Sequence, residues 1–163
     1  MNTRLCFACM KPVDTPTAIC PHCGHDNHIR DNGPGLLSGG MIADKYIVGM
    51  LLGRGGFGAT YIGYDLVMQR RVALKEYFPS HLVTRDGNSS RLSVISGSGD
   101  SYTRGKQRAL RESRMVSGLD TLPGVVQTYD VFAANNTIYI VMEYVEGRNL
   151  QEHVKGNYGR ISW

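Results

Sequence analysis

Three glycines in the first half of the chain have the types and spacing of a phosphate-binding turn. Gly53, Gly55 and Gly58 form the pattern G-x-G-x-x-G, and Lys75 ends the segment R-V-A-L-K that follows. Glycine lacks a Cβ atom, so a turn rich in glycine can bring backbone N–H groups close to an anion. The triplet alone leaves the kind of nucleotide loop open, because Rossmann folds use the same spacing.

The residues after the third glycine distinguish between three kinds of nucleotide loop. A Rossmann loop opens a helix at this point, whereas the sequence A-T-Y-I-G-Y from Ala59 to Tyr64 is β-branched and aromatic and favours a strand. A Walker loop needs Gly-Lys-Ser/Thr, which does not follow the glycines. The order strand, glycine loop, strand, lysine is typical of a protein-kinase nucleotide loop.

Four cysteines near the start of the chain form a second candidate site. Two C-x-x-C pairs can each wrap a tight turn around one ion, and four thiolates complete the tetrahedral shell that zinc prefers. Nearby histidines could replace a ligand, but the thiolates already fill the shell. Two disulfides or unused thiols are the alternative. We expect a structural zinc ribbon without an open coordination position, with the ligands Cys6, Cys9, Cys20 and Cys23.

The predicted ribbon has few apolar residues with which to build a core. Most of that core is expected from Leu5, Phe7, Val13 and Ile19. Metal binding must therefore supply the folding free energy, roughly 10 kcal/mol or more for structural zinc in small peptides.

Composition restricts the class of protein. The 163 residues are 42% apolar and 20% charged, which is typical of a soluble globular protein. No apolar run approaches the roughly 18 residues that span a bilayer, and no signal peptide opens the chain. Clustered cysteines then indicate a reducing compartment, so we expect a cytoplasmic protein with no membrane segment in this chain.

Nucleic-acid binding is a further alternative that the sequence does not favour. The net charge of +4 is only mildly positive. Aromatic residues are not interleaved with basic residues in the ribbon, so no platform for stacking bases is visible.

Three segments must position these sites. Residues 1–29 form the ribbon, and residues 44–163 form the main domain. The glycines of residues 30–43 predict a flexible linker, in which Leu36-Leu37 is the part that could pack against one neighbour. A first strand runs into the glycine loop, and a turn at Asn135-Asn136 joins two later strands. A small hairpin is expected within residues 77–99. The remaining predicted strands are 59–64, 71–75, 125–133 and 137–142.

One long helix is expected from about Asp100 to Ser117, with cap residues at its start. Its basic residues predict a solvated face, and phosphate or partner binding is the alternative. The expected inward stripe consists of Ala109, Glu112 and Val116, with Leu119 continuing it.

With these motifs together, the chain resembles the N-terminal lobe of bacterial Hanks-type serine/threonine protein kinases that carry an N-terminal zinc ribbon. The likeness lies in C-x-x-C and C-P-x-C-G ahead of G-R-G-G-F-G and K-E-Y-F-P, and it covers about residues 5 to 163. It implies an α+β fold, in which the small ribbon precedes a five-stranded antiparallel sheet with one long helix. The hinge and the start of the C-lobe would follow, with the C-lobe itself missing.

The resemblance also implies the roles of site residues. Lys75 would hold the α- and β-phosphates of ATP, and Glu112 in A-L-R-E-S-R would pair with Lys75, with Glu76 as a competing acid. Met142 matches the gatekeeper, the backbone of the next residues would bind adenine, Ala73 would lie above it, and Asn149 would approach the ribose. The implied nucleotide site is Leu52, Gly53, Arg54, Gly55, Gly56, Phe57, Gly58, Thr60, Ala73, Lys75, Met142, Glu143, Val145 and Asn149.

Two departures from the family pattern affect the expected activity. Thr60 stands where the family usually has valine, and the sequence lacks H-R-D-x-x-x-x-N and D-F-G, which supply the base and the Mg²⁺ ligands. We therefore expect transfer of the ATP γ-phosphate to protein serine or threonine only in a full-length parent, with this chain an inactive truncated or excised fragment. A non-catalytic nucleotide- or partner-binding module with a zinc ribbon is the alternative.

Overall fold

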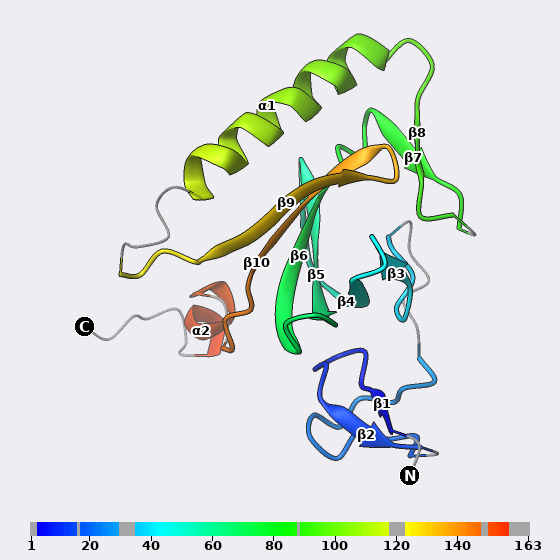
Figure 1. Cartoon of the computed structure of the whole chain (residues 1–163), viewed down its shortest axis with the longest axis vertical. Coiled ribbons are helices and arrows are strands. Elements are labelled where there is room, and N and C mark those ends of the chain that lie inside the picture. The colour runs from blue at the N-terminus through cyan, green and yellow to red at the C-terminus, as the bar shows by residue number, and fades with distance from the viewer. Residues whose placement is uncertain are drawn as a thin grey trace.

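The computed structural model describes residues 3–15, 17–29, 35–87, 89–117, 123–147 and 150–156. A small N-terminal unit contains the antiparallel pair β1 (Thr3–Leu5) and β2 (Pro12–Asp14). Figure 1 shows this unit at the end of the molecule away from the long helix α1 (Gly99–Ser117). We call residues 3–29 the ribbon.

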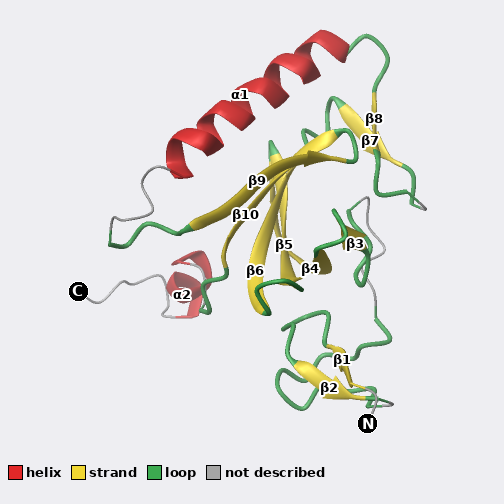
Figure 2. Cartoon of the chain, in the orientation of Figure 1, coloured by secondary structure: helices red, strands yellow, loops and turns green. Residues whose placement is uncertain are grey.

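The main unit is an antiparallel sheet of six strands in the order β3-β4-β5-β6-β10-β9 (Figure 2). The predicted five strands and long helix are present, which confirms the fold class, and a two-residue strand β3 adds to one edge. The strands are β3 (Met41–Ile42), β4 (Tyr46–Gly55), β5 (Gly58–Asp65), β6 (Arg70–Tyr77), β9 (Thr128–Ala134) and β10 (Thr137–Glu143).

The hydrophobic core lies along the middle strands of this sheet. Tyr61 and Leu74 are buried at facing positions of β5 and β6, and Tyr139 is buried on β10. Tyr46 stacks on Phe132 with ring centroids 5.6 Å apart. Large aromatic side chains thus fill the core and hold β5 and β10 against β6, the strand that carries Lys75.

Residues 35–42 do not behave as the flexible linker that their glycines predict. Gly39 N–H donates to the Val48 carbonyl oxygen (2.7 Å), and Val48 N–H donates to Gly40 (2.8 Å). Leu36 is buried, and its N–H donates to the Tyr61 hydroxyl (3.2 Å). The bonds with Val48 satisfy backbone groups on the outer edge of β4. Their gain outweighs the conformational entropy that a glycine-rich segment loses when it becomes ordered.

The hairpin expected within residues 77–99 consists of β7 (Val83–Arg85) and β8 (Leu92–Val94). Leu92 N–H donates to Asn135 at 2.9 Å, so the hairpin lies against the turn between β9 and β10. That turn has the predicted left-handed backbone, with φ of 52° at Asn135 and 62° at Asn136.

Helix α1 is anchored at its first half, and its buried face differs from the predicted stripe. Tyr102 is buried and stacks on Tyr77, and a Cβ atom at Gly105 would lie 2.0 Å from the Tyr77 hydroxyl. Ser113 is buried, whereas the Glu112 side chain, beside the cavity between α1 and the sheet, is exposed. The side chain of Val116 and all of Leu119 lie outside the described residues.

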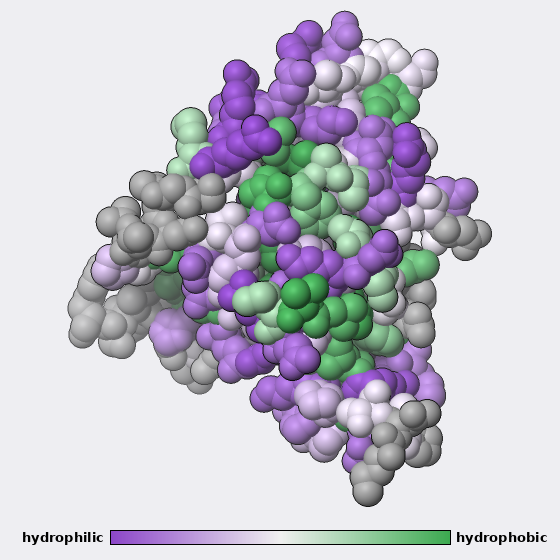
Figure 3. All heavy atoms as spheres, viewed as in Figure 1, coloured by the Kyte–Doolittle hydropathy of each residue, from purple (hydrophilic) through white to green (hydrophobic). Residues whose placement is uncertain are grey.

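The outer face of α1 is solvated, as its basic residues predict. Figure 3 shows hydrophilic side chains over this helix, and Arg104, Arg108, Arg111 and Arg114 are exposed. A short helix, α2 (Leu150–Gly156), follows the sheet. Neither helix, within the described ranges, is long and apolar enough to cross a membrane.

Candidate functional site

The glycine motif forms the tight hairpin between β4 and β5. Gly55 pairs with Gly58, which leaves Phe57 at the tip with 74% of its surface exposed. Space is open around Gly53, Gly55 and Gly56, since a Cβ atom at each would meet no atom within 4 Å. At Gly58 a Cβ atom would lie 2.7 Å from the carbonyl oxygen of Glu76. The first glycines thus keep the hairpin face open, and the last allows β5 and β6 to approach.

Lys75 extends from β6 next to this hairpin. Lys75 pairs with Thr60 in the β5–β6 register, and Thr60 is two residues after Gly58. The Lys75 side chain is exposed. Ala73 and Met142 face each other across β6 and β10, and Ala73 is buried. The sheet therefore brings together residues that are far apart in the sequence, such as Thr60 and Met142.

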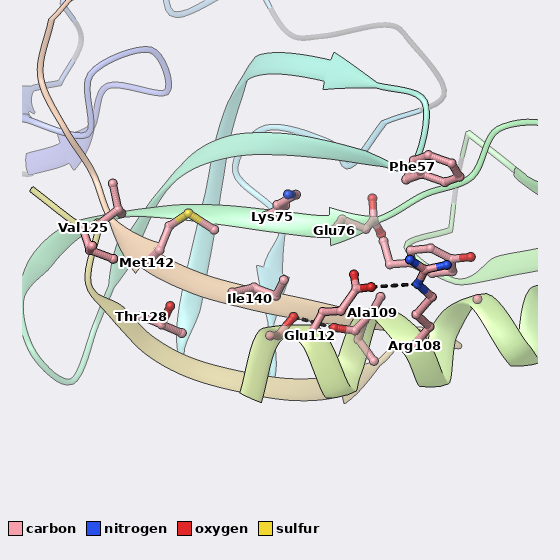
Figure 4. Close-up of a pocket in the computed structure, with 15 residues that line it drawn as sticks. Phe57, Lys75, Glu76, Arg108, Ala109, Glu112, Val125, Thr128, Ile140 and Met142 are labelled. Atoms are coloured by element: carbon pink, nitrogen blue, oxygen red, sulfur yellow. Dashed lines mark hydrogen bonds and ion pairs between the residues drawn. The ribbon is translucent and has the colours of Figure 1, made fainter. Parts of the chain in front are cut away.

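A cavity of about 730 Å³ lies between α1 and strands β6, β9 and β10. Figure 4 shows Lys75 and Met142 on the sheet side and Glu112 on the helix side of this space. Most of the remaining lining is apolar, including Val125, Ile138 and Ile140. A space of this size, mainly apolar with a few polar groups, has the character of a ligand pocket.

Glu112 and Lys75 line the same cavity but are not joined by any ion pair among the described residues. The Glu112 carboxylate instead accepts from Arg108 Nε at 2.7 Å, one helical turn away (Figure 4). Both partners are largely exposed. Glu112 lies on the sheet side of α1, so its predicted pairing with Lys75 requires a shift of the helix or a change of its side-chain rotamer.

Glu76, the acid that could compete for Lys75, is engaged elsewhere. It is completely buried and forms an ion pair with Arg85 of β7, whose side chain is 1% exposed. The Tyr139 hydroxyl donates to the same carboxylate at 2.9 Å, and the Tyr61 hydroxyl donates at 3.3 Å. Burial opposes the charge on Arg85, but the hydrogen bond to Glu76 prevails and raises the pKa of Arg85.

This buried network was missed from the sequence. Its only local signal is the segment K-E-Y-F-P, which places an acid beside the lysine. Arg85 lies in a turn-rich segment, so nothing in the spacing connects it to Glu76. Phe78 adds to the network, because the guanidinium groups of Arg54 and Arg85 both lie 5.3 Å from its ring centroid.

The segment after β10 is held to the sheet by charge. Arg71 of β6 forms an ion pair with Glu146, which lowers the pKa of Glu146. Glu143 N–H donates to the Gln127 carbonyl oxygen at 2.8 Å, and Val145 is exposed. Asn149 lies outside the described residues.

The four cysteines of the ribbon converge on one point. Their sulfur atoms all lie within 4.8 Å of one another, with 3.7 Å between Cys6 and Cys23 and 3.8 Å between Cys9 and Cys20. A tetrahedron of zinc–sulfur bonds about 2.3 Å long has edges of about 3.8 Å. The donor set therefore fits a tetrahedral thiolate site, and no histidine of the described residues joins it.

The surroundings of the sulfur atoms favour a thiolate at one of them. Burial acts to raise the pKa of Cys20, but hydrogen bonds from the backbone of His22 and Cys23 prevail and lower it to about 7. Burial raises the pKa of Cys9 to about 12. All four cysteines are free rather than joined in disulfides.

The predicted core of the ribbon is only partly correct. Val13 is buried, but Ile19 is 53% exposed. The buried cluster is Cys6, Val13 and Cys20, with Ala8 and Cys9 packed against it. The cysteine side chains themselves occupy the centre of so small a unit, which leaves no room for Ile19.

A family model for the protein kinase domain matches residues 46–162 of the chain. This chain belongs to the protein kinase family. Several curated relatives are bacterial serine/threonine kinases. PrkC of Bacillus subtilis is 30% identical over 122 residues, which cover 75% of this chain and 16% of PrkC.

Two further relatives of this kinase-family chain extend the comparison. PknD of Chlamydia pneumoniae is 31% identical over 119 residues, covering 73% of this chain and 11% of PknD. PknG of Mycolicibacterium smegmatis is 29% identical, covering 93% of this chain and 19% of PknG. The chain thus spans less than a fifth of each of these relatives.

Solved structures agree with the fold. A chain described as PpkA-294 in its apo form superimposes with a TM-score of 0.69 at 24% identity, covering 76% of this chain and 43% of that one. The PknI kinase domain of Mycobacterium tuberculosis gives 0.54 at 21% identity, covering 78% and 44%.

Proposed function

We propose that this chain is the ATP-binding part of a serine/threonine protein kinase that transfers the γ-phosphate of ATP to hydroxyl groups of protein substrates. The observation that carries the proposal is the position of Lys75 beside the open glycine hairpin. An exposed ammonium group there can neutralise phosphate oxygens that the backbone N–H groups of the hairpin approach.

The adenine end of the site follows from the same sheet. Ala73 and Met142 form an apolar surface across β6 and β10, and the backbone of Glu143 and Val145 continues from it. We propose that the adenine ring packs on this surface and that its edge bonds to that backbone. Asn149 is proposed for the ribose from the family resemblance alone.

We further propose that this chain binds nucleotide without transferring phosphate by itself. The family's catalytic base and Mg²⁺ ligands come from the H-R-D and D-F-G motifs, which these 163 residues lack. The second candidate is a non-catalytic module that binds nucleotide or a partner and is not part of an active kinase. The pairing of Glu112 with Arg108 rather than with Lys75 favours this candidate.

Titration with a fluorescent ATP analogue tests the binding site. We expect the wild-type chain and Lys155→Met, a control on α2, to bind, and Lys75→Met to lose affinity by about tenfold or more, because a charged contact to phosphate is lost. Equal affinity in all three would contradict the proposal.

Incubation with labelled ATP tests for phosphoryl transfer by the chain alone. We expect no phosphate on the chain itself or on a generic protein substrate. Incorporation that persists in the wild type and disappears in Lys75→Met would show that this chain is catalytic.

We also propose that the cysteine cluster binds one structural Zn²⁺ ion. The sulfur–sulfur distances support a tetrathiolate site. Bound there, the ion would join the two C-x-x-C turns covalently in a unit that has almost no other core.

A further inference from the structure

The two cysteine turns of the ribbon have the same backbone but differ at one residue. In each, the residue after the second cysteine donates its N–H to the carbonyl oxygen of the first, Met10 to Cys6 at 2.7 Å and Gly24 to Cys20 at 2.9 Å. Both residues have a left-handed backbone conformation, with φ of 53° at Met10 and 74° at Gly24. Glycine adopts this backbone readily, whereas methionine does not. An unfavourable residue at such a position suggests that its side chain has another role.

The Met10 side chain leaves the ribbon and packs against the sheet. Met10 is 1% exposed, yet it is not part of the ribbon's own buried cluster. A Cβ atom at Gly49 of β4 would lie 2.4 Å from Met10 Cε and 2.7 Å from Ile62 Cγ2. Gly49 therefore leaves the space that Met10 fills, whereas a Cβ at Gly24 would meet nothing within 4 Å.

The backbone of the same turn completes the edge of β4. The Phe7 carbonyl oxygen accepts from Met50 N–H at 2.8 Å, and Phe7 N–H donates to the side chain of Asn27 at 3.3 Å. Asn27 is buried in the ribbon. The register between β4 and β5 shifts between Val48 and Leu51, so Met50 lies where the sheet's own pairing is interrupted.

We propose that the turn from Cys6 to Met10, when its cysteines hold a metal ion, clamps β4 and thereby positions the glycine hairpin for nucleotide. Phe7 and Met10 are positioning residues in this device. Met50 precedes Leu52 and Gly53 by two and three residues, so a restraint at Met50 acts directly on the start of the hairpin. The effect on nucleotide rests on the proposed function, whereas the clamp itself does not.

The metal is required because Phe7 lies between two ligands, Cys6 and Cys9. A metal ion that holds the sulfur atoms of Cys6 and Cys9 also holds the Phe7 carbonyl group in place. It likewise fixes the direction in which the Met10 side chain leaves the turn. Without the ion, only a small buried cluster and the hydrogen bonds of the ribbon hold the turn. The clamp should then open although the core of the sheet is intact.

Hydrogen exchange at the Met50 amide of the full chain tests the clamp. We expect this amide to exchange about tenfold faster or more after zinc is removed with a chelator, while Leu74 in the sheet interior is unchanged. Met10→Gly should retain its zinc, because glycine suits the left-handed backbone, and should show the same acceleration with metal bound. Met68→Ala, an exposed methionine on the β5–β6 turn, is the control and should behave as wild type.

Gly49→Ala provides a second test that alters no ribbon residue. Its Cβ would displace Met10 and the Phe7 carbonyl, so Met50 should exchange rapidly whether or not zinc is bound. The clamp is refuted if Met50 exchanges at the same rate in the zinc-loaded, chelated and Gly49→Ala proteins.

Affinity for a fluorescent ATP analogue tests the link to the hairpin. We expect several-fold weaker binding by Met10→Gly at an unchanged thermal midpoint of the sheet. Normal binding despite faster Met50 exchange would refute the positioning role. Absence of binding in the wild type would refute the proposed function of this chain, and the exchange data would still decide whether the clamp exists.

Discussion

The ribbon and the six-stranded sheet are stabilised by different means. The ribbon's own buried cluster is small and consists of Cys6, Val13 and Cys20. The sheet has a continuous core that includes Tyr46, Tyr61, Leu74 and Tyr139. A unit without a core depends on crosslinks, whereas a unit with one depends on burial of apolar surface. We therefore expect different perturbations to unfold the two units, although they touch through Met10 and Gly49.

Loss of a metal ligand should have the largest effect and should separate the two units. Cys20→Ser is expected to unfold the ribbon, because structural zinc contributes roughly 10 kcal/mol or more to folding of such units. The strands of the main sheet should persist, as measured by circular dichroism and by exchange of sheet amides. His22→Ala, next to two ligands, is the control and should keep its zinc.

Elemental analysis sharpens this prediction. We expect one zinc ion per wild-type chain. Well under one equivalent of metal, or disulfides found by mass spectrometry, would be incompatible with the ribbon as described.

Breaking the buried ion pair should destabilise the sheet and leave the ribbon folded. Arg85→Met leaves the Glu76 carboxylate buried and unpaired, which typically costs about 3–5 kcal/mol. Denaturant unfolding should show this loss, with zinc content unchanged. Glu76→Gln with Arg85→Met should recover part of the stability, because no unpaired charge remains. A loss no greater than that of Arg108→Ala, which cuts an exposed pair, would contradict the burial argument.

Exchanging the residue after the second cysteine tests the difference between the two turns. Gly24→Met places a side chain on a left-handed backbone with no surface to contact, so we expect the ribbon to lose roughly 1–2 kcal/mol. Zinc affinity in competition with a chelator measures this loss. Met10→Gly should not weaken zinc binding. If Met10→Gly and Gly24→Met weaken zinc binding equally, the two turns are equivalent.

The smallest change in stability is expected at the exposed pair on α1. Arg108→Ala should leave unfolding of the sheet unchanged, since both partners are exposed. It frees Glu112 to approach Lys75, so affinity for an ATP analogue should rise slightly. Glu112→Gln in the same background should remove that gain. A gain that survives Glu112→Gln would show that Arg108 acts by another route.

Local patterns predicted the elements of the fold correctly. The strands around the glycine motif, the turn at Asn135-Asn136 and helix α1 follow from residue propensities and turn chemistry over short spans. The cysteine cluster could also be predicted, because C-x-x-C spacing closes each half of the site locally. The roles of Lys75 and Glu112 remain predictions.

Contacts between distant segments could not be predicted in the same way. Glu112 matches the helical period of Ala109, but the helix packs through Tyr102 and Gly105, which contact Tyr77 of the sheet. Residues 35–42 have the glycine content of a linker, yet the free edge of β4 binds them.

The sequence by itself determined the candidate sites and the elements of this protein: four cysteines at metal-binding spacing, a glycine hairpin followed by a lysine, and the order of strands and helix. The tertiary structure alone decided which charges pair and where the ribbon docks. Glu76 finds Arg85 because β6 and the β7–β8 hairpin meet in a buried space, where an unpaired charge is costly. The ribbon docks on β4, where the Phe7 carbonyl oxygen accepts from Met50 N–H and Gly49 leaves space for Met10. Such choices depend on burial and on unsatisfied backbone groups, which exist only once the chain has folded.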